Sequence, residues 1–205
     1  GITAGAGTVG LLANQDGAGA QGFSQADATT IAGTGITVTV NTAAGTGTGA
    51  AVVSNLTDAG TLTIKTNNTA NDAGGSITRT ATSTLGATTA VNLTTGTGDI
   101  GAAGTEINLA AGQTGVVATT HGAGRIYLRD TGSLTLGAIT TAGGLVDIAT
   151  TGVGTLTAGG AIATSGGNVT LNSQDALAVN GGITAGAGTV GLLANQDGAG
   201  AQGFS

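Results

Sequence analysis

The opening segment of the chain occurs a second time, without a change, at its end. Residues 1–24 read GITAGAGTVGLLANQDGAGAQGFS, and residues 182–205 read the same letters. Repetition at a fixed interval, here from Gly1 to Gly182, is typical of repeat proteins. The alternative is a short motif that occurs twice in a finite domain, but isolated motifs normally drift in sequence. We therefore interpret residues 1–181 as one complete repeat unit and residues 182–205 as the start of the next.

Between the two copies, short segments with alternating apolar residues recur. Each places two apolar side chains on one face with a small or polar residue between them, which is the period of a half-buried strand. The segments are 8–11, 37–40, 61–64, 90–93, 106–109, 125–128, 145–148 and 168–171. Their average spacing, about 23 residues, predicts about eight turns per unit. A further strand is possible at Ser76-Ile77-Thr78.

Glycine-containing corners such as 141–144, 165–167 and 185–188 follow the later strands and predict a solenoid of parallel strands. In parallel stacking, equivalent residues lie above one another, so we expect two inward ladders. The first ladder is Val38, Leu62, Val91, Ile107, Ile126, Val146, Val169 and Val190. The second is Val40, Ile64, Leu93, Leu109, Leu128, Ile148, Leu171 and Leu192.

The composition fits a thin core and excludes several classes of protein. The chain has one Tyr and two Phe, so Val, Ile, Leu and Ala must fill the interior. Its 42 Gly disfavour helices, and a hydrophobic content of 40% disfavours disorder. The absence of Cys removes disulfides and thiolate metal sites. No apolar run is long enough for a membrane-spanning helix. The scattered basic residues argue against nucleic acid as a partner: Lys65, Arg79, Arg125 and Arg129.

We expect no catalytic, cofactor-binding or metal-binding residue. The ten acidic residues are spread along the unit: Asp16, Asp27, Asp58, Asp72, Asp99, Glu106, Asp130, Asp147, Asp175 and Asp197. Stacking could still bring acids such as Asp130 and Asp147 together on one face, as polysaccharide-cleaving β-helices do. Such enzymes also use aromatic residues for sugar stacking, and this chain has a single Tyr. The sequence therefore favours a non-enzymatic role.

Three smaller features also have simple interpretations. The single histidine, His121, is expected at a solvent-facing corner. The segment 14–17 and its copy 195–198 are interpreted as turns, with calcium binding as the alternative. Arg125 and Arg129 are expected to form charge pairs with Asp130 and Glu106 on the outer face.

The units GNVTLNSQDALAVNGGI (167–183) and GSLTLGAITTAGGLVDI (132–148) resemble the degenerate repeats of filamentous-haemagglutinin-type exoproteins and other large bacterial adhesins. This resemblance implies a right-handed parallel β-helix, secretion to the cell surface and a rod-like structural or adhesive role. The family's repeat has no functional residues to carry over.

We therefore expect an all-β chain, a right-handed parallel β-helix, that serves as a fibre-forming repeat of a giant extracellular or cell-surface protein. Its expected partners are adjacent identical repeats stacked end to end, with lateral association of like chains as a further possibility. The alternative is an adhesin stalk that binds carbohydrate or another cell through its outer Thr, Asn and Asp side chains.

Overall fold

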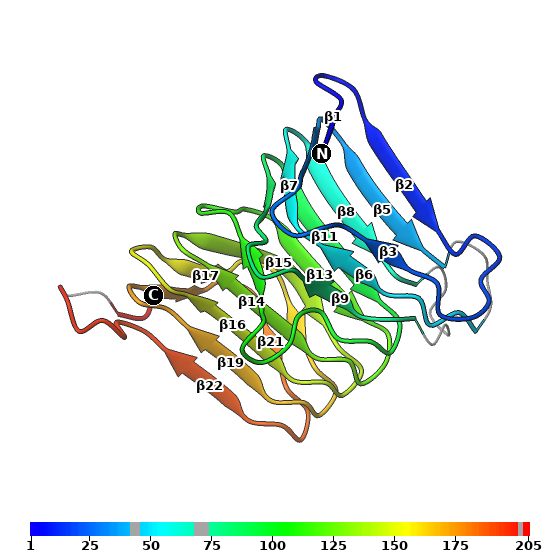
Figure 1. The fold of residues 1–205 in the computed structure, drawn as a ribbon. Helices are drawn as coiled ribbons and strands as arrows, with labels where there is room; N and C mark the ends of the chain where they lie inside the picture. The colour runs from blue at the N-terminus through cyan, green and yellow to red at the C-terminus, as the bar shows by residue number, and fades with distance from the viewer. Residues whose placement is uncertain (42–45, 68–73, 201–202) are drawn as a thin grey trace.

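The computed structural model describes residues 1–41, 46–67, 74–200 and 203–205. Within these ranges every regular element is a β-strand, and every pair of named strands is parallel. The strands stack as rungs from the blue N-terminal end to the red C-terminal end (Figure 1). The prediction of an all-β parallel solenoid is confirmed. In the described part of the chain, no helix is long and apolar enough to cross a membrane.

Two broad sheets form the walls of the solenoid, and a small third sheet joins them in the first turns. The nine-stranded sheet contains β1 (Ile2–Thr3), β4 (Thr30–Gly33), β7 (Asn55–Asp58), β10 (Leu85–Ala87), β12 (Ile107–Leu109), β14 (Ile126–Asp130), β16 (Val146–Thr150), β19 (Val169–Asn172) and β22 (Val190–Leu193). The ten-stranded sheet contains β2 (Val9–Ala13), β5 (Ile36–Val40), β8 (Thr61–Lys65), β11 (Ala90–Thr95), β13 (Val116–Thr120), β15 (Leu134–Thr140), β17 (Leu156–Ala158), β18 (Ile162–Ala163), β20 (Leu177–Val179) and β21 (Ile183–Thr184). The third sheet contains β3 (Phe23–Ser24), β6 (Ala51–Val53) and β9 (Ile77–Arg79). The possible strand at Ser76-Ile77-Thr78 is therefore real.

The number of turns is about seven, not the expected eight. One column of paired residues runs through the ten-stranded sheet in seven steps: Leu11, Val38, Ile64, Leu93, Ala118, Ile139, Ile162 and Ile183. The error lies in the interval from Val91 to Ile107, which the sequence pattern counts as one turn. Val91 is in β11 of one wall and Ile107 is in β12 of the other, so this interval crosses the solenoid without completing a turn.

The predicted ladders therefore group the wrong residues together, although the prediction that their side chains point inward is confirmed for most of them. Each mixes the two walls, changing sheet between β11 and β12. The register also differs, because Val38 pairs with Ile64 rather than with Leu62. The ladder residues do point inward and are buried, apart from Val190 and Leu192 in the last strand. Full burial of each such aliphatic side chain contributes about 1.5–3 kcal/mol to the stability of the fold.

The turns become shorter along the chain. In the column from Leu11 to Ile183, every one of the first four steps is longer than any of the last three. The step from Ile64 to Leu93 is the longest, and the step from Ala118 to Ile139 is among the shortest. In the long turns the third sheet adds a strand, and its last member β9 continues through Ile77, Ile100 and Ile126 into β14. Two short strands separated by a bend are thus replaced by one straight strand.

A column of buried threonines lines one corner of the solenoid. These side chains are at most 1% exposed, and their hydroxyls donate to glycine carbonyls a few residues further along the chain. Thr95 donates to Gly98 at 2.6 Å, and Thr141 donates to Gly144 at 2.6 Å. Thr120 and Thr164 make the same bonds to Gly124 and Gly167. The hydroxyls therefore satisfy carbonyls that the corner turns away from the ladder.

The glycines of this corner are required because successive turns approach each other closely. A Cβ atom on Gly144 would lie 1.9 Å from the carbonyl oxygen of Gly124, and one on Gly167 would lie 2.0 Å from that of Gly144. Real Cβ atoms do not approach backbone oxygens so closely, so a side chain here would force the turns apart. The glycine corners predicted from the sequence are confirmed, and their cause is this contact between neighbouring turns.

Candidate functional site

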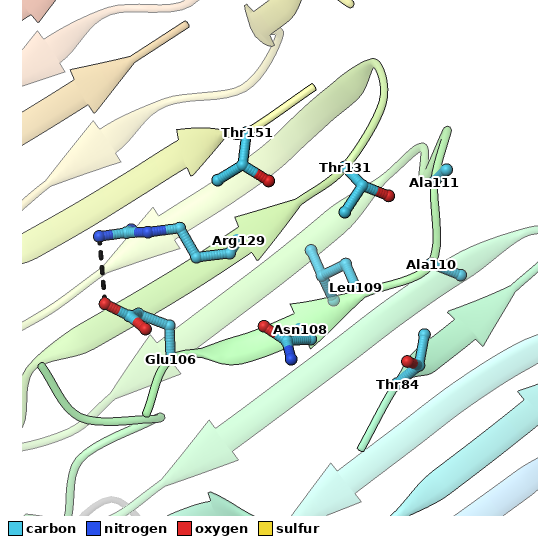
Figure 2. Close-up of a pocket in the computed structure, with 9 residues that line it drawn as sticks. All are labelled: Thr84, Glu106, Asn108, Leu109, Ala110, Ala111, Arg129, Thr131 and Thr151. Carbon is cyan, nitrogen blue, oxygen red and sulfur yellow. Dashed lines mark ion pairs between the residues drawn. The ribbon is translucent and has the colours of Figure 1, made fainter. Parts of the chain in front are cut away.

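A group of three paired charged side chains lies on the outer face of the nine-stranded sheet. Arg129 in β14 pairs with Glu106, which precedes β12, at 3.3 Å between Nη2 and Oε1 (Figure 2). On the other side Arg129 pairs with Asp147 in β16 at 3.1 Å between Nη1 and Oδ1. These residues alternate with buried neighbours such as Leu128 and Ile148, so the strand period directs them outward.

The guanidinium of Arg129 lies between the carboxylates of Glu106 and Asp147 and pairs with both. Partial burial alone would raise the pKa of Glu106. Hydrogen bonds from backbone amides, including Gly104, and the positive charges of Arg129 and Arg79 outweigh burial, so the pKa of Glu106 is lowered. Glu106 therefore stays ionised beside Arg129. The two ion pairs that share Arg129 contribute a small amount to the stability of the fold, as is typical of partly exposed ion pairs.

A depression of about 530 Å³ lies beside this ion pair. Asn108, Thr131 and Thr151 present polar side chains around it, while Leu109 and two alanines line its remaining wall (Figure 2). Its chemistry is that of a hydrogen-bonding surface. The chain's only tyrosine, Tyr127, is 6% exposed and does not line it.

The charge pairs predicted for this region are half correct. Arg129 and Glu106 pair as expected, but Asp130 does not face outward. Asp130 is 1% exposed and stands in register between Leu109 and Thr150. Arg125 makes no ion pair within the described residues; its backbone N–H donates to the Asp99 carboxylate at 2.7 Å. The strand period explains the correction, because Arg129 and Asp130 are adjacent and must point to opposite faces.

Asp130 has a structural role at a corner. Its carboxylate accepts hydrogen bonds from the N–H groups of Gly132, at 2.7 Å, and Gln113, at 3.4 Å. Burial raises the pKa of Asp130, against the lowering effect of these backbone bonds. A buried acid that caps backbone amides satisfies donors that the sheet ladder leaves open.

Two other buried acids also accept hydrogen bonds from backbone N–H groups. Asp58 accepts from the N–H groups of Gly60, at 2.6 Å, and Ile36, at 2.5 Å. Asp175 accepts from Gly154 at 2.6 Å. In Asp58 and Asp130, the acid bonds the amide two residues ahead, which is the geometry of an Asx turn. The spacing Asp-x-Gly is the sequence signal that would have identified both as corner residues.

The expected turn and corner residues are where the sequence placed them. His121 is exposed in the corner that follows β13. In segment 14–17, Gly17 donates to the Asn14 carbonyl and Asp16 accepts from the Ala18 N–H at 3.1 Å, so this segment is a turn. Among the residues that the structure describes, no three His, Asp or Glu side chains are grouped to hold a metal ion. Asp72 lies outside the described residues.

Sequence reasoning missed the buried amide side chains. Gln25 is 7% exposed and Asn41 is 1% exposed, and both bond backbone groups of neighbouring turns. Gln25 donates to the carbonyls of Thr29 and Asn55 and accepts from the Ser54 N–H. Neither residue carries a sequence pattern that distinguishes it from an exposed turn residue.

Comparison of the chain with protein-family models, with curated proteins and with solved structures gives no match. The functional argument therefore depends on the geometry of this solenoid.

Proposed function

We propose that this chain is a structural, fibre-forming repeat of a larger extracellular or cell-surface protein. Adjacent identical repeats stack end to end and give a long, stiff rod. The extracellular setting is carried by the resemblance in pattern to large bacterial exoproteins, and the mechanical role is carried by the geometry of the repeated segment. The proposal assigns the chain no catalytic activity.

The observation that supports the rod is the way the two identical segments pair. The first copy pairs with the turn that follows it. The N–H of Ala4 donates to the carbonyl oxygen of Ala32 at 2.9 Å, and the N–H of Val9 donates to that of Gly35 at 2.9 Å. The second copy pairs with the turn that precedes it. The carbonyl oxygen of Thr184 accepts from the N–H of Thr164 at 3.0 Å, and the carbonyl oxygen of Thr189 accepts from the N–H of Val169 at 2.8 Å.

These two sets of bonds use different backbone groups of the same sequence. Thr184 and Thr189 correspond to Thr3 and Thr8, whose neighbours Ala4 and Val9 make the bonds in the first copy. One such segment can therefore pair with a turn on each side at the same time. A segment that is satisfied on both edges is a continuous rung, and a chain of tandem units then has no break in main-chain pairing.

The test is the length of chains that contain one, two or three complete units, each with the sequence of residues 1–181. Rungs are separated by about 4.8 Å, so a unit of somewhat more than seven turns should add roughly 36 Å. Electron microscopy and small-angle X-ray scattering should show one unbranched rod whose length rises in equal steps. Units that appear as separate beads, or that collapse into a compact particle, would contradict the proposal.

The depression beside Arg129 favours a second candidate, a stalk that binds carbohydrate through its outer face. Asn108, Thr131 and Thr151 can offer amide and hydroxyl groups to sugar hydroxyls. In this case the purified repeat should bind glycans, and Arg129→Ala should weaken that binding. Arg125→Ala is the matched control, since Arg125 is exposed and does not line the depression. Glycan binding that both variants leave unchanged would place the binding surface elsewhere.

A further inference from the structure

The identical segments have the same local structure. Gly5 and Gly186 have φ angles of 57° and 60°, and Asn14 and Asn195 have 49° and 55°. The N–H of Gly7 donates to Ala4, and the N–H of Gly188 donates to Ala185, both at 2.9 Å. The sequence of this segment thus specifies a strand, a corner and a second strand in both places.

The same segments nevertheless lie on opposite walls of the solenoid. In the first copy, β1 belongs to the nine-stranded sheet and β2 to the ten-stranded sheet. In the second copy the order is reversed, because β21 lies in the ten-stranded sheet and β22 in the nine-stranded sheet (Figure 1). The repeat interval is therefore not a whole number of turns.

The column of paired residues gives the size of the offset. Ile183 stands seven turns after Leu11 in the same column, whereas its counterpart in the first copy is Ile2. The unit thus contains seven turns plus the stretch from Ile2 to Leu11. That stretch is slightly less than half as long as one narrow turn, such as the step from Ile162 to Ile183. The remainder is therefore slightly less than half a turn.

We infer that successive repeats join with an offset of about half a turn, so that the two walls exchange places from each unit to the next. This rests on the proposed function. The partner surface is the free edge of β22 together with β21, and its occupant is the following unit of the same chain. That unit would cover Val190–Leu193 with its own Ile36–Val40, in the register observed between β2 and β5.

One consequence is a surface with a period of two units. The outward group around Arg129 would face one side of the rod in one unit and the opposite side in the next. A rod that presents the same groups alternately on two sides can contact like chains on both sides.

The two-unit chain allows a direct test with spin labels, because the sequence contains no cysteine. Thr170 and Ala178 are outward positions on opposite walls of the first unit, and each is replaced by Cys in turn. Each is paired with Asn92→Cys in the second unit. The observed register connects Thr170 to Gly191. It connects Gly10, the counterpart of Gly191, to Asn92 through Thr37 and Thr63.

The offset places Thr170 and the second unit's Asn92 on one wall, four rungs or about 19 Å apart. The label on Ala178 then lies across the solenoid and should give a clearly longer distance to Asn92. A shorter distance from Ala178 than from Thr170, in a chain that still forms one rod, would overturn the half-turn offset and leave the fibre proposal intact. Absence of a single rod in the unlabelled two-unit chain would overturn both.

Discussion

The wide N-terminal turns and the narrow C-terminal turns of this solenoid differ in one bend of the main chain and in the side chain that satisfies it. In the wide turns a bend separates two short strands, as between β6 and β7, and the buried amide of Gln25 bonds the backbone groups at that bend. In the narrow turns one straight strand of the nine-stranded sheet, such as β16, replaces the pair, so this bend is absent. The threonine corner is common to both regions, with Thr95 in a wide turn and Thr141 in a narrow one. The additional bend of a wide turn thus requires a buried polar side chain of its own.

Glycines at close contacts between successive turns occur in both regions, and substituting them should have the largest effect on the free energy of unfolding. A Cβ on Gly144 would lie 1.9 Å from the Gly124 carbonyl oxygen, and one on Gly49, in a wide turn, would lie 1.9 Å from that of Gln21. Gly144→Ala and Gly49→Ala should each lower the free energy of unfolding by about 3 kcal/mol or more, measured in urea. Gly10→Ala, with open space around its Cβ position, is the control and should change it by less than about 0.5 kcal/mol. Equal effects of all three would show that the turns can separate freely.

The amide of Gln25 should matter next, and only in the wide turns. Gln25→Met keeps the approximate shape of the side chain but removes its three hydrogen bonds. Gln25 donates to the carbonyls of Thr29, at 2.9 Å, and Asn55, at 3.2 Å, and accepts from the Ser54 N–H at 3.0 Å. Leaving these buried groups unpaired should cost about 3 kcal/mol. Hydrogen exchange should show faster opening of β6 and β7 than of β16 and β19. Uniformly faster exchange would mean that the two regions unfold as one unit.

A smaller effect is expected in the narrow turns. Thr141→Val replaces the hydroxyl by a methyl group of similar size and removes the 2.6 Å bond to the Gly144 carbonyl. The loss of one hydrogen bond should lower the free energy of unfolding by about 1 kcal/mol. Hydrogen exchange should locate the change at the corner between β15 and β16. A cost as large as that of Gln25→Met would show that the threonine corner contributes as much to stability as the additional bend of the wide turns.

The sequence predicts the local structure of both regions better than their placement. Strands and glycine corners follow from alternation and from the residues at bends. The wall that a strand joins does not, because Val91 and Ile107 lie in similar patterns but in different sheets. The segment that occurs twice shows why: the same strand–corner–strand sequence fits either wall. The wall is set by the summed lengths of the preceding turns, and the pattern of a single segment does not contain that sum.

The candidate site is predictable to a similar degree. The pairing of Arg129 with Glu106 follows from their charge and spacing, whereas the inward direction of Asp130 follows from its parity with Arg129 in one strand. The role of Gln25 depends on a bend between β6 and β7 that no residue pattern predicts.

The smallest predicted effect concerns an exposed acid that links wide turns. The backbone N–H of Thr82 donates to Asp27 at 3.1 Å, and its hydroxyl donates at 2.8 Å. Hydrogen bonds from the backbone and the side chain of Thr82 lower the pKa of Asp27 to about 2 from an ordinary value of 3.8. The folded state therefore binds this proton less readily than the unfolded state, so the contribution of Asp27 is present above pH 3.8 and is lost as the pH falls to about 2.

Asp27→Asn should remove this part of the acid dependence. Between pH 4 and pH 2 the urea midpoint of the native chain should fall more steeply than that of the variant. Thr82→Val, which removes the hydroxyl donor and keeps the backbone donor, should give an intermediate slope. Because Asp27 links wide turns, the difference should appear in the exchange of amides near β7 and β10 and not in β16 or β19. Parallel pH profiles for all three proteins would show that this link does not stabilise the wide turns.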